Sequence, residues 1–164
     1  MAVKIVTDST SDLPAQVTQE LGITVIPLNV QFGDEAFRDG VDLDSDTFFR
    51  RLQESPQLPT TSQPSVGAFL EVYRTLLDAG DEVVSIHISA KLSGTMNSAL
   101  QAQNQLDAGP RLAIVDSLTS GLALGVVAVA AAKVAKEGAS HGTTVEAARR
   151  ASEQVHVFFL VETL

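Results

Sequence analysis

The sequence of 164 residues contains no cysteine, and this absence excludes several kinds of chemistry. Disulfides, thiolate nucleophiles and cysteine-bound zinc or iron–sulfur sites are ruled out. Cations are also few, because 11 Lys and Arg residues face 20 Asp and Glu residues and leave a net charge of −9. Such an acidic surface repels phosphate groups, so nucleic acid and anionic membranes are poor candidate partners.

The sequence also lacks a long apolar run. Its most apolar stretch, residues 121–132, is shorter than the roughly 20 residues that span a bilayer, and we expect it to form a buried helix. The chain reaches Asp8 too early for the apolar core of a signal peptide. Hydrophobic residues at 45% and charged residues at 19% are typical of a globular protein. We therefore expect a cytoplasmic domain without stable membrane insertion.

Strand-like and helix-like segments alternate along the chain. Apolar runs bounded by turn residues predict strands over residues 3–6, 23–32, 82–88, 111–115 and 156–161. Apolar residues at helical spacing, with capping residues, predict helices at about 14–22, 44–52, 65–77, 95–106, 119–136 and 144–155. This alternation favours an α/β fold with a mostly parallel sheet and helices on both faces.

Two segments depart from this alternation. Pro27, inside the run at 23–32, predicts an edge position or a bulge, and residues 33–35 predict a hairpin turn. Between residues 55 and 65, three prolines together with Ser and Thr predict an extended, non-helical path.

Standard enzyme signatures are absent from the sequence. It has no phosphate-binding P-loop, no dinucleotide-binding glycine motif, no nucleophile elbow and no HExxH zinc motif. Three aspartates between residues 42 and 46 have the opening spacing of a calcium loop, but the required glycine and final glutamate are missing. The histidines, including His87 in a predicted strand, have no metal-site spacing, so we expect structural roles for them.

Hydroxyl-bearing residues gather where three of the predicted strands end. Such clusters occupy residues 8–11, 89–95 and 116–117, and residues 60–62 could reach the same place. Ligands of parallel α/β sheets bind at the carboxyl ends of the strands, so we expect one crevice there. Each of the three clusters precedes a helix, whose N-terminus offers free N–H groups. This combination suits a carboxylate or a phosphate.

The clusters differ in how strongly they indicate a ligand. Ser9, Ser65 and Ser117, taken singly, are better explained as ordinary helix caps than as ligand-binding residues. The segment Leu92-Ser93-Gly94-Thr95 is the stronger candidate, because Gly94 allows close backbone approach beside an exposed Ser93.

The same segments resemble, in order, the signatures of the DegV family of bacterial fatty-acid-binding proteins. The matching segments are DSTSDL at 8–13, TTSQPS at 60–65, ISAKLSGT at 88–95 with Ser98-Ala99 after it, and DS at 116–117. Each motif is short, but four of them in order at matching spacing are specific. The resemblance runs from Val3 to the end of the chain.

The resemblance implies that residues 1–164 form the amino-terminal α/β domain of a DegV-like protein. A second domain, absent from this chain, would follow, and the apolar run before Leu164 also leads us to expect that the natural protein continues. One long-chain fatty acid, such as palmitate or oleate, would lie between the two domains. The family's carboxylate-binding threonine and serine match Thr61 and Ser93.

Further ligand-binding residues follow from the hydroxyl clusters. By our own inference, Gly94 and Thr95 add backbone donors at the start of a helix. The complete set that we expect is Thr61, Ser93, Gly94, Thr95, Ser9 and Ser117.

The resemblance implies a non-catalytic role, with no cofactor and no metal. The protein would present its fatty acid to the catalytic subunit of a fatty acid kinase, which forms an acyl phosphate. A separate chain carrying the carboxy-terminal domain would be a second partner. The residues alone leave two alternatives open: a small-molecule phosphotransferase or hydrolase that uses Asp8 or Asp116 as a base in the crevice, and a purely structural or protein-interaction fragment.

Overall fold

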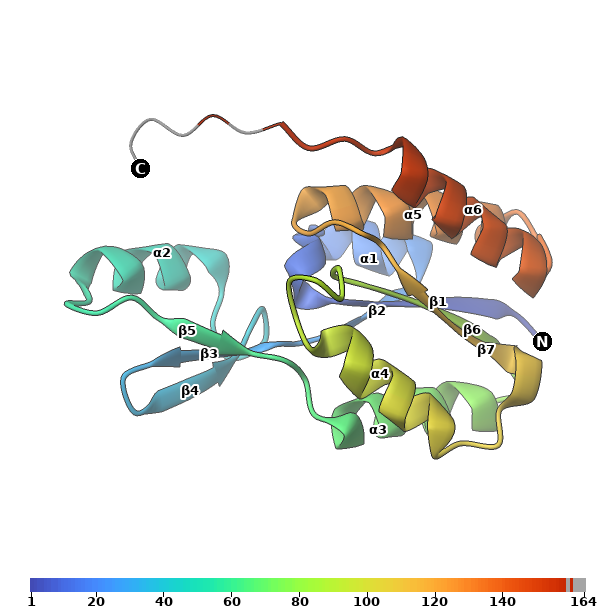
Figure 1. Ribbon diagram of the computed structural model, residues 1–164, viewed down its shortest axis with the longest axis horizontal. Helices are drawn as coiled ribbons and strands as arrows, with labels where there is room; N and C mark the ends of the chain where they lie inside the picture. The colour runs from blue at the N-terminus through green and yellow to red at the C-terminus, as the bar shows by residue number, and fades with distance from the viewer. Residues whose placement is uncertain (159, 161–164) are drawn as a thin grey trace.

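The computed structural model describes residues 1–158 and 160, and its centre is a four-stranded parallel sheet (Figure 1). Its strands, in spatial order, are β2 (Ile23–Ile26), β1 (Val3–Asp8), β6 (Glu82–His87) and β7 (Leu112–Asp116). Ile5 of β1 pairs with Ile23 on one side and with Val84 on the other. The chain therefore changes direction across the sheet between β1 and β6, which makes their carboxyl ends the expected ligand crevice.

Helices cover both faces of this sheet, as the sequence predicts (Figure 1). One face carries α3 (Val66–Asp78) and α4 (Thr95–Asn104), and the other carries α1 (Ala15–Leu21), α5 (Leu122–Lys136) and α6 (His141–Gln154). Alternate residues of each strand fill the two cores: Ile5 packs with α5, whereas Val6 packs with α3. Within the described residues, no helix is both long and apolar enough to cross a membrane.

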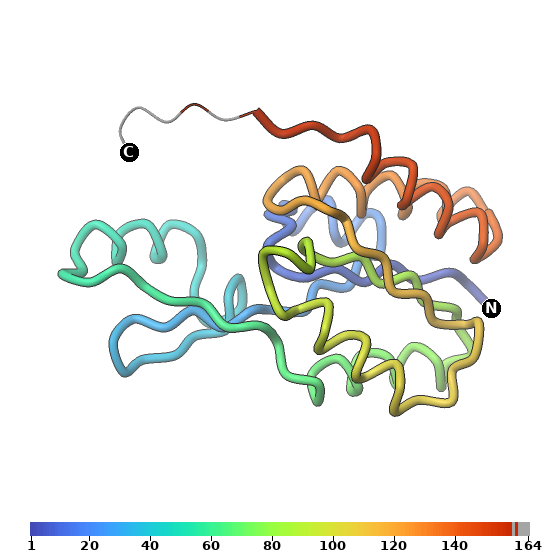
Figure 2. The backbone as a smooth tube through the Cα atoms, in the orientation of Figure 1, coloured from blue at the N-terminus to red at the C-terminus, as the bar shows by residue number. Residues whose placement is uncertain are grey.

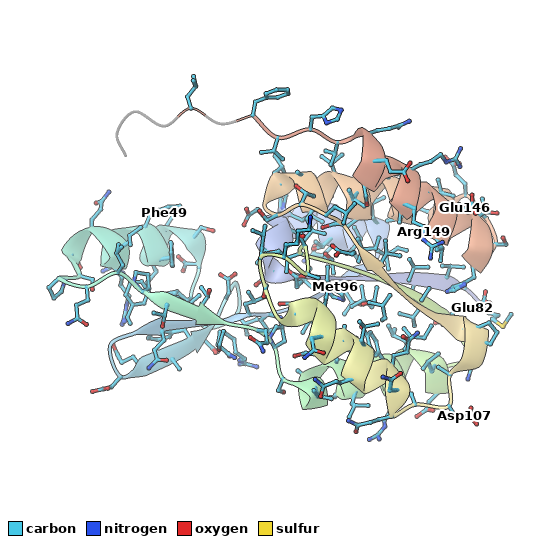
Figure 3. The ribbon with its side chains drawn as sticks, viewed as in Figure 1. Phe49, Glu82, Met96, Asp107, Glu146 and Arg149 are labelled. Carbon is cyan, nitrogen blue, oxygen red and sulfur yellow. The ribbon has the colours of Figure 1, made fainter. Side chains whose placement is uncertain are left out.

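A second, smaller sheet projects from the parallel sheet (Figures 1 and 2). Its antiparallel strands, in spatial order, are β4 (Glu35–Arg38), β3 (Asn29–Phe32) and β5 (Thr60–Ser62). Helix α2 (Ser45–Glu54) covers it, with Phe48 against the buried Val30 and Phe32, while Phe49 stays exposed (Figure 3). The hairpin expected at 33–35 is present, because β3 and β4 flank that turn.

The strand expected over residues 23–32 is two strands. Pro27 and Leu28 separate β2, at the edge of the parallel sheet, from β3 of the small sheet. Proline supplies no N–H to a ladder, and the N–H of Leu28 donates to Ser9 Oγ at 3.0 Å. This break lets one run of apolar residues serve both sheets.

The strand expected over residues 156–161 is not formed by its described members, 156–158 and 160. These residues follow α6 and pair with no strand, and Phe158 and Leu160 are fully exposed. An apolar run becomes a strand when a neighbour satisfies its N–H and C=O groups, and nothing in the described residues provides that neighbour. Residues 159 and 161 lie outside the described residues.

Two helices begin at other residues than expected. α5 begins at Leu122 rather than near Thr119, because Leu118 and Gly121 have positive φ angles of 60° and 63° and interrupt the helix. α6 begins at His141 rather than Thr144, because the Ser140 side chain caps it by accepting a hydrogen bond from the N–H of Thr143.

Helix α5 approaches the turn after β1 at Gly125, and this contact yields a stability prediction. A Cβ at Gly125 would lie 2.5 Å from the backbone oxygen of Ser11 and 2.9 Å from Leu13 Cδ2. Because backbone cannot yield as a side chain can, we expect Gly125→Ala to lower the free energy of unfolding by about 1–3 kcal/mol. Urea unfolding followed by circular dichroism measures this change.

The matched control is Gly142→Ala in α6. A Cβ at Gly142 would meet nothing within 4 Å, so this variant is expected to be neutral or more stable by up to about 1 kcal/mol. Equal free energies of unfolding for the two variants would contradict the close approach at Gly125.

Candidate functional site

The loops that follow β1, β6 and β7 lie together at one edge of the parallel sheet, as their hydroxyl clusters predict. β1 leads into the 3₁₀ turn η1 (Ser9–Ser11), β6 into residues 88–94, and β7 into residues 117–121. Two of these loops are joined directly: the N–H of Ser89 donates to the backbone oxygen of Thr119 at 2.9 Å. These loops border the switch point between β1 and β6, where the crevice is expected.

Ser93 stands at the start of α4 and is half-buried. Its Oγ lies 2.9 Å from Oγ1 of Thr95 and accepts a hydrogen bond from the N–H of Thr95 at 3.3 Å. Because Thr95 is fully buried, it holds the Ser93 hydroxyl in place. The N-cap residue, Gly94, has no side chain that could cap the helix, so the first turn of α4 keeps donors for a ligand.

Thr61 comes from the other sheet. It lies in β5 opposite Val30 of β3 and is exposed. Among residues 1–158 and 160, its hydroxyl makes no hydrogen bond. The hydroxyl is therefore available to a ligand.

Gln63 brings the Thr61 segment against the Ser93 segment; it lies in the TTSQPS signature, but no sequence pattern gave it a role. A Cβ built on Gly94 would lie 2.8 Å from Gln63 Nε2 and 2.9 Å from Gln63 Cδ, so the carboxamide covers the Gly94 Cα. Thr61 lies two residues before Gln63 in the sequence, and Ser93 lies directly before Gly94. The structure thus joins the two segments that the sequence places 32 residues apart.

The other two candidate serines are already hydrogen-bonded within the chain. Ser9 Oγ accepts a hydrogen bond from the N–H of Leu28 at 3.0 Å and so ties η1 to the break between β2 and β3. Ser117 is fully buried, and its Oγ donates to the backbone oxygen of Thr119 at 3.2 Å. In the structure both hydroxyls hold loops.

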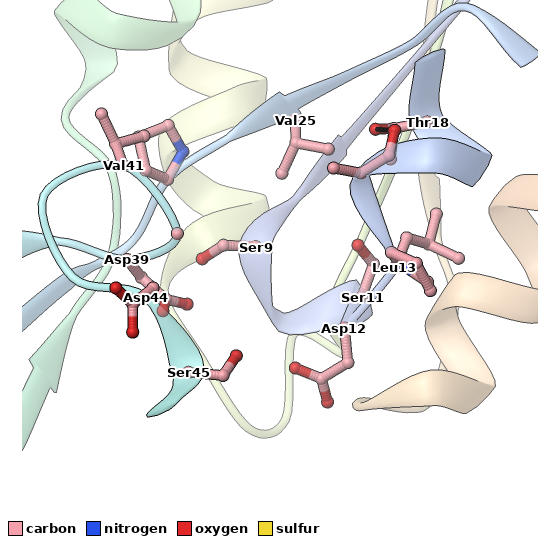
Figure 4. Close-up of a pocket in the computed structure, with 14 residues that line it drawn as sticks. Ser9, Ser11, Asp12, Leu13, Thr18, Val25, Asp39, Val41, Asp44 and Ser45 are labelled. Carbon is pink, nitrogen blue, oxygen red and sulfur yellow. Dashed lines mark hydrogen bonds between the residues drawn. The ribbon is translucent and has the colours of Figure 1, made fainter. Parts of the chain in front are cut away.

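A cleft of about 580 Å³ lies beside η1, and neither Thr61 nor Ser93 lines it (Figure 4). Burial, followed by the negative charges of Asp39 and Asp8, raises the pKa of Asp12 in this cleft. Three carboxylates line the cleft, those of Asp12, Asp39 and Asp44. So much negative charge opposes the binding of a carboxylate or a phosphate.

Asp8, the last residue of β1, is a fully buried carboxylate with four donors. Its Oδ2 accepts hydrogen bonds from His87 Nδ1 at 2.9 Å and from the N–H of Ile88 at 3.0 Å. Its Oδ1 accepts from the N–H of Thr10 at 3.1 Å and from the Thr10 hydroxyl. Burial acts to raise the pKa of Asp8, but His87, Thr10 and Ile88 outweigh it, so the pKa is lowered.

The hydrogen-bond chain continues from His87 to the middle of the sheet. His87 Nε2 lies 2.6 Å from Ser85 Oγ, and the Tyr73 hydroxyl donates to Ser85 Oγ at 2.8 Å. Asp8, His87 and Ser85 thus follow the order of a hydrolase triad. All three side chains are fully buried, and the Tyr73 hydroxyl already donates a hydrogen bond to Ser85 Oγ. No substrate therefore reaches this serine. The structural role expected for His87 agrees with this geometry.

Asp116, the other candidate base, is also hydrogen-bonded to the backbone. Its Oδ1 accepts from the N–H of Leu118 at 2.9 Å and its Oδ2 from the N–H of Ala90 at 3.3 Å. It joins the loops after β6 and β7. In the part of the chain that the structure describes, no group of three or more His, Asp or Glu side chains is arranged to hold a metal ion.

Asp8→Asn tests the buried network. We expect it to lower the free energy of unfolding at pH 7 by about 2–4 kcal/mol, because an amide replaces an acceptor that four donors require. The folded-state pKa of Asp8 is lowered. Its stabilising contribution is therefore complete above the unfolded-state pKa of about 3.9 and is lost as pH falls through the folded-state pKa. The difference between wild type and variant should shrink at acidic pH.

Urea unfolding at pH 7, 5 and 3 measures this difference. Asp34→Asn is the matched control, because Asp34 is exposed in a turn, and it should change the free energy of unfolding by less than about 0.5 kcal/mol. A difference for Asp8→Asn that stays constant down to pH 3 would contradict the lowered pKa.

The chain is similar to a known family over nearly its whole length. The family model described as "Uncharacterised protein, DegV family" matches residues 2–164. A DegV domain-containing protein of Halalkalibacterium halodurans is 40% identical over 163 residues, which cover 99% of this chain and 57% of that protein. The chain thus spans little more than half the length of this relative.

Solved structures share the fold described above. The crystal structure of DegV, a fatty acid binding protein from Bacillus subtilis, matches with a TM-score of 0.85 and 34% identity over 93% of this chain and 54% of that one. A stearic acid-binding protein from Eubacterium ventriosum matches with a TM-score of 0.81 and 31% identity over 88% of this chain and 51% of that one. The family signatures, the fold and these similarities agree: the chain belongs to the DegV family.

Proposed function

We propose that this chain binds the carboxylate of a long-chain fatty acid, with the hydroxyls of Thr61 and Ser93 as donors. The observation that carries the proposal is the Gln63–Gly94 contact, which brings the segment that carries the unbonded Thr61 hydroxyl against the segment that carries the oriented Ser93 hydroxyl. Two relatives with the same fold support it, since the Bacillus subtilis protein is a fatty acid binding protein and the Eubacterium ventriosum protein binds stearic acid.

The chemistry of the site suits one carboxylate. Hydroxyl groups donate to an anion without adding a charge of their own, and the α4 N-terminus, beside Ser93, favours negative charge. Each hydrogen bond to a charged group contributes about 1.5–3 kcal/mol. A 16-carbon tail, at roughly 0.8 kcal/mol per methylene, contributes up to about 12 kcal/mol before ordering costs. The tail would therefore dominate the affinity, and the hydroxyls would orient the ligand.

Exposed apolar side chains beside the Ser93 loop suit the acyl chain. Leu92 is 65% exposed and Leu118 is 62% exposed, on two loops joined by the Ser89–Thr119 hydrogen bond. Leu122 and Val126 add an exposed pair, four residues apart on one face of α5. Contiguous exposed apolar side chains mark a binding surface more often than isolated ones do.

The proposal assigns no catalytic residue to this chain. Asp8 and Asp116 both accept hydrogen bonds from within the chain, so neither is a free base. The chain would position the lipid so that a partner fatty acid kinase transfers a phosphoryl group to the carboxylate and forms an acyl phosphate. A separate chain that carries the rest of the family's length would complete the acyl-chain site.

Lipid binding tests the proposal. We would measure it for this chain alone and for this chain joined to the part of Bacillus subtilis DegV that follows the matched region. Native mass spectrometry, with solvent extraction of the same sample, is expected to find one fatty acid per protein in at least one form. No lipid in either form, even after incubation with stearic acid, would overturn the proposal.

Removal of the two hydroxyls tests the residue assignment. Thr61→Ala and Ser93→Ala are each expected to weaken stearate binding about tenfold, which corresponds to the loss of one hydrogen bond to a charged group. Thr60→Ala is the matched control and should bind like the wild type, because Thr60 lies beside Thr61 on β5 and projects to the other face. Displacement of a fluorescent fatty acid measures the affinities. Wild-type affinity in both variants would show that the assignment is wrong.

A further inference from the structure

We propose that Gln63 is a third donor to the bound carboxylate, and that residue 94 is glycine because the Gln63 carboxamide occupies the space of a side chain there. Gln63 would make the site selective for an ionised acid over a neutral head group. This inference rests on the proposed function of Thr61 and Ser93 and extends it by one residue.

The backbone of Gly94 does not require glycine. Its φ of −72° and ψ of 0° lie where any residue is allowed. The space around it is taken by the Gln63 carboxamide, which any larger side chain would displace, since a Cβ would lie 2.8 Å, 2.9 Å and 3.2 Å from Nε2, Cδ and Oε1 of Gln63. The missing side chain at residue 94 therefore makes room for the carboxamide.

The Gln63 carboxamide has donors to spare. Among residues 1–158 and 160, neither its Nε2 nor its Oε1 takes part in a hydrogen bond, and a carboxamide carries two N–H donors. Its side chain is exposed, but the residues that follow it in the chain are fixed in place. Pro64 is buried, and Ser65 caps α3 by accepting from the N–H of Ala68 at 3.1 Å. The head group of Gln63 is thus placed over Gly94 with its polar atoms unused.

A carboxylate fits the donors that meet there. An ionised carboxylate accepts about four hydrogen bonds and donates none. Gln63 Nε2 lies over the Gly94 N-cap of α4, directly after Ser93, whose hydroxyl Thr95 orients. Three neutral side-chain donors, from residues 61, 63 and 93, would then surround one anion beside a helix N-terminus.

Gln63→Glu tests whether Gln63 acts as a hydrogen-bond donor to the ligand or only fills space. The variant keeps the size of the side chain but replaces the NH₂ donor by a negatively charged acceptor. We expect it to weaken stearate binding at least about 30-fold, because like charges face each other. The affinity for stearyl alcohol should change less than about threefold, since the alcohol can donate to a carboxylate. The acid-to-alcohol affinity ratio should therefore fall at least about tenfold.

Gly94→Ala provides a second, independent variant. The added methyl group would displace the flexible carboxamide without moving backbone, so we expect stearate binding to weaken about fivefold while the protein stays folded. In a Gln63→Ala background the same change should have no further effect, because the group that it displaces is gone. Gln63→Ala alone should weaken stearate binding by about the same factor as Gly94→Ala.

Competition binding with stearate and stearyl alcohol, on the form of the protein that binds stearate, measures all of these variants, and thermal unfolding confirms their folding. Equal losses for acid and alcohol in Gln63→Glu, or an unchanged affinity for stearate, would overturn the donor role of Gln63. If Thr61→Ala and Ser93→Ala weaken stearate binding while Gln63→Glu does not, this inference fails and the proposed function stands. If the wild type binds no stearate in either form, the proposed function fails and this inference fails with it.

Discussion

The buried carboxylate of Asp8 is the group on which the geometry of the crevice depends. It accepts hydrogen bonds from Thr10 in η1 and from His87 and Ile88 at the end of β6, so one acceptor joins the two strands between which the chain changes direction. Ile88 leads directly into the loop that ends at Ser93. A charged group that is withdrawn from water costs several kcal/mol unless donors replace the water. Four donors do so here, and they hold the loops in one arrangement.

This network also shows why the order of residues in a site does not by itself establish a function. Asp8, His87 and Ser85 have the connectivity of a nucleophilic triad, and Tyr73 extends it. A nucleophile must also meet a substrate, and none of these side chains is accessible. The hydroxyls for which we propose ligand binding, those of the exposed Thr61 and the half-buried Ser93, lie elsewhere. The network therefore holds the loops at the edge of the sheet where we propose ligand binding.

Part of the fold could be predicted from sequence because the central strand β6 is buried on both faces. Residues 83–87 of β6 are all buried, so an apolar run is visible without any alternation. The small sheet was harder to predict. Its strand β5 has only three residues, Thr60–Ser62, and all three are exposed, so no apolar pattern marks it. These residues form a strand because they pair with residues 29–31. The described members of the run at 156–161, residues 156–158 and 160, show the converse, since they pair with no strand among the described residues.

The candidate site also has features that local sequence indicates and features that it does not. Hydroxyl clusters at strand ends are local features, so the sequence predicts that the three loops lie together, and the resemblance to DegV proteins implies roles for Thr61 and Ser93. Contacts between distant residues left no local sign. Asp8 and His87 are 79 residues apart, and Gln63 meets Gly94 across the junction of the two sheets. Such pairs depend on how helices and sheets pack, which periodicity and motif spacing do not encode.

We propose that two segments, one from each sheet, form a single carboxylate site. A crystal structure with a brominated stearic acid tests it most directly, because the bromine locates the tail and the remaining density locates the head group. We expect a carboxylate within about 3 Å of the hydroxyls of Thr61 and Ser93. A carboxylate in the cleft beside η1, among Asp12 and Asp39, would contradict it.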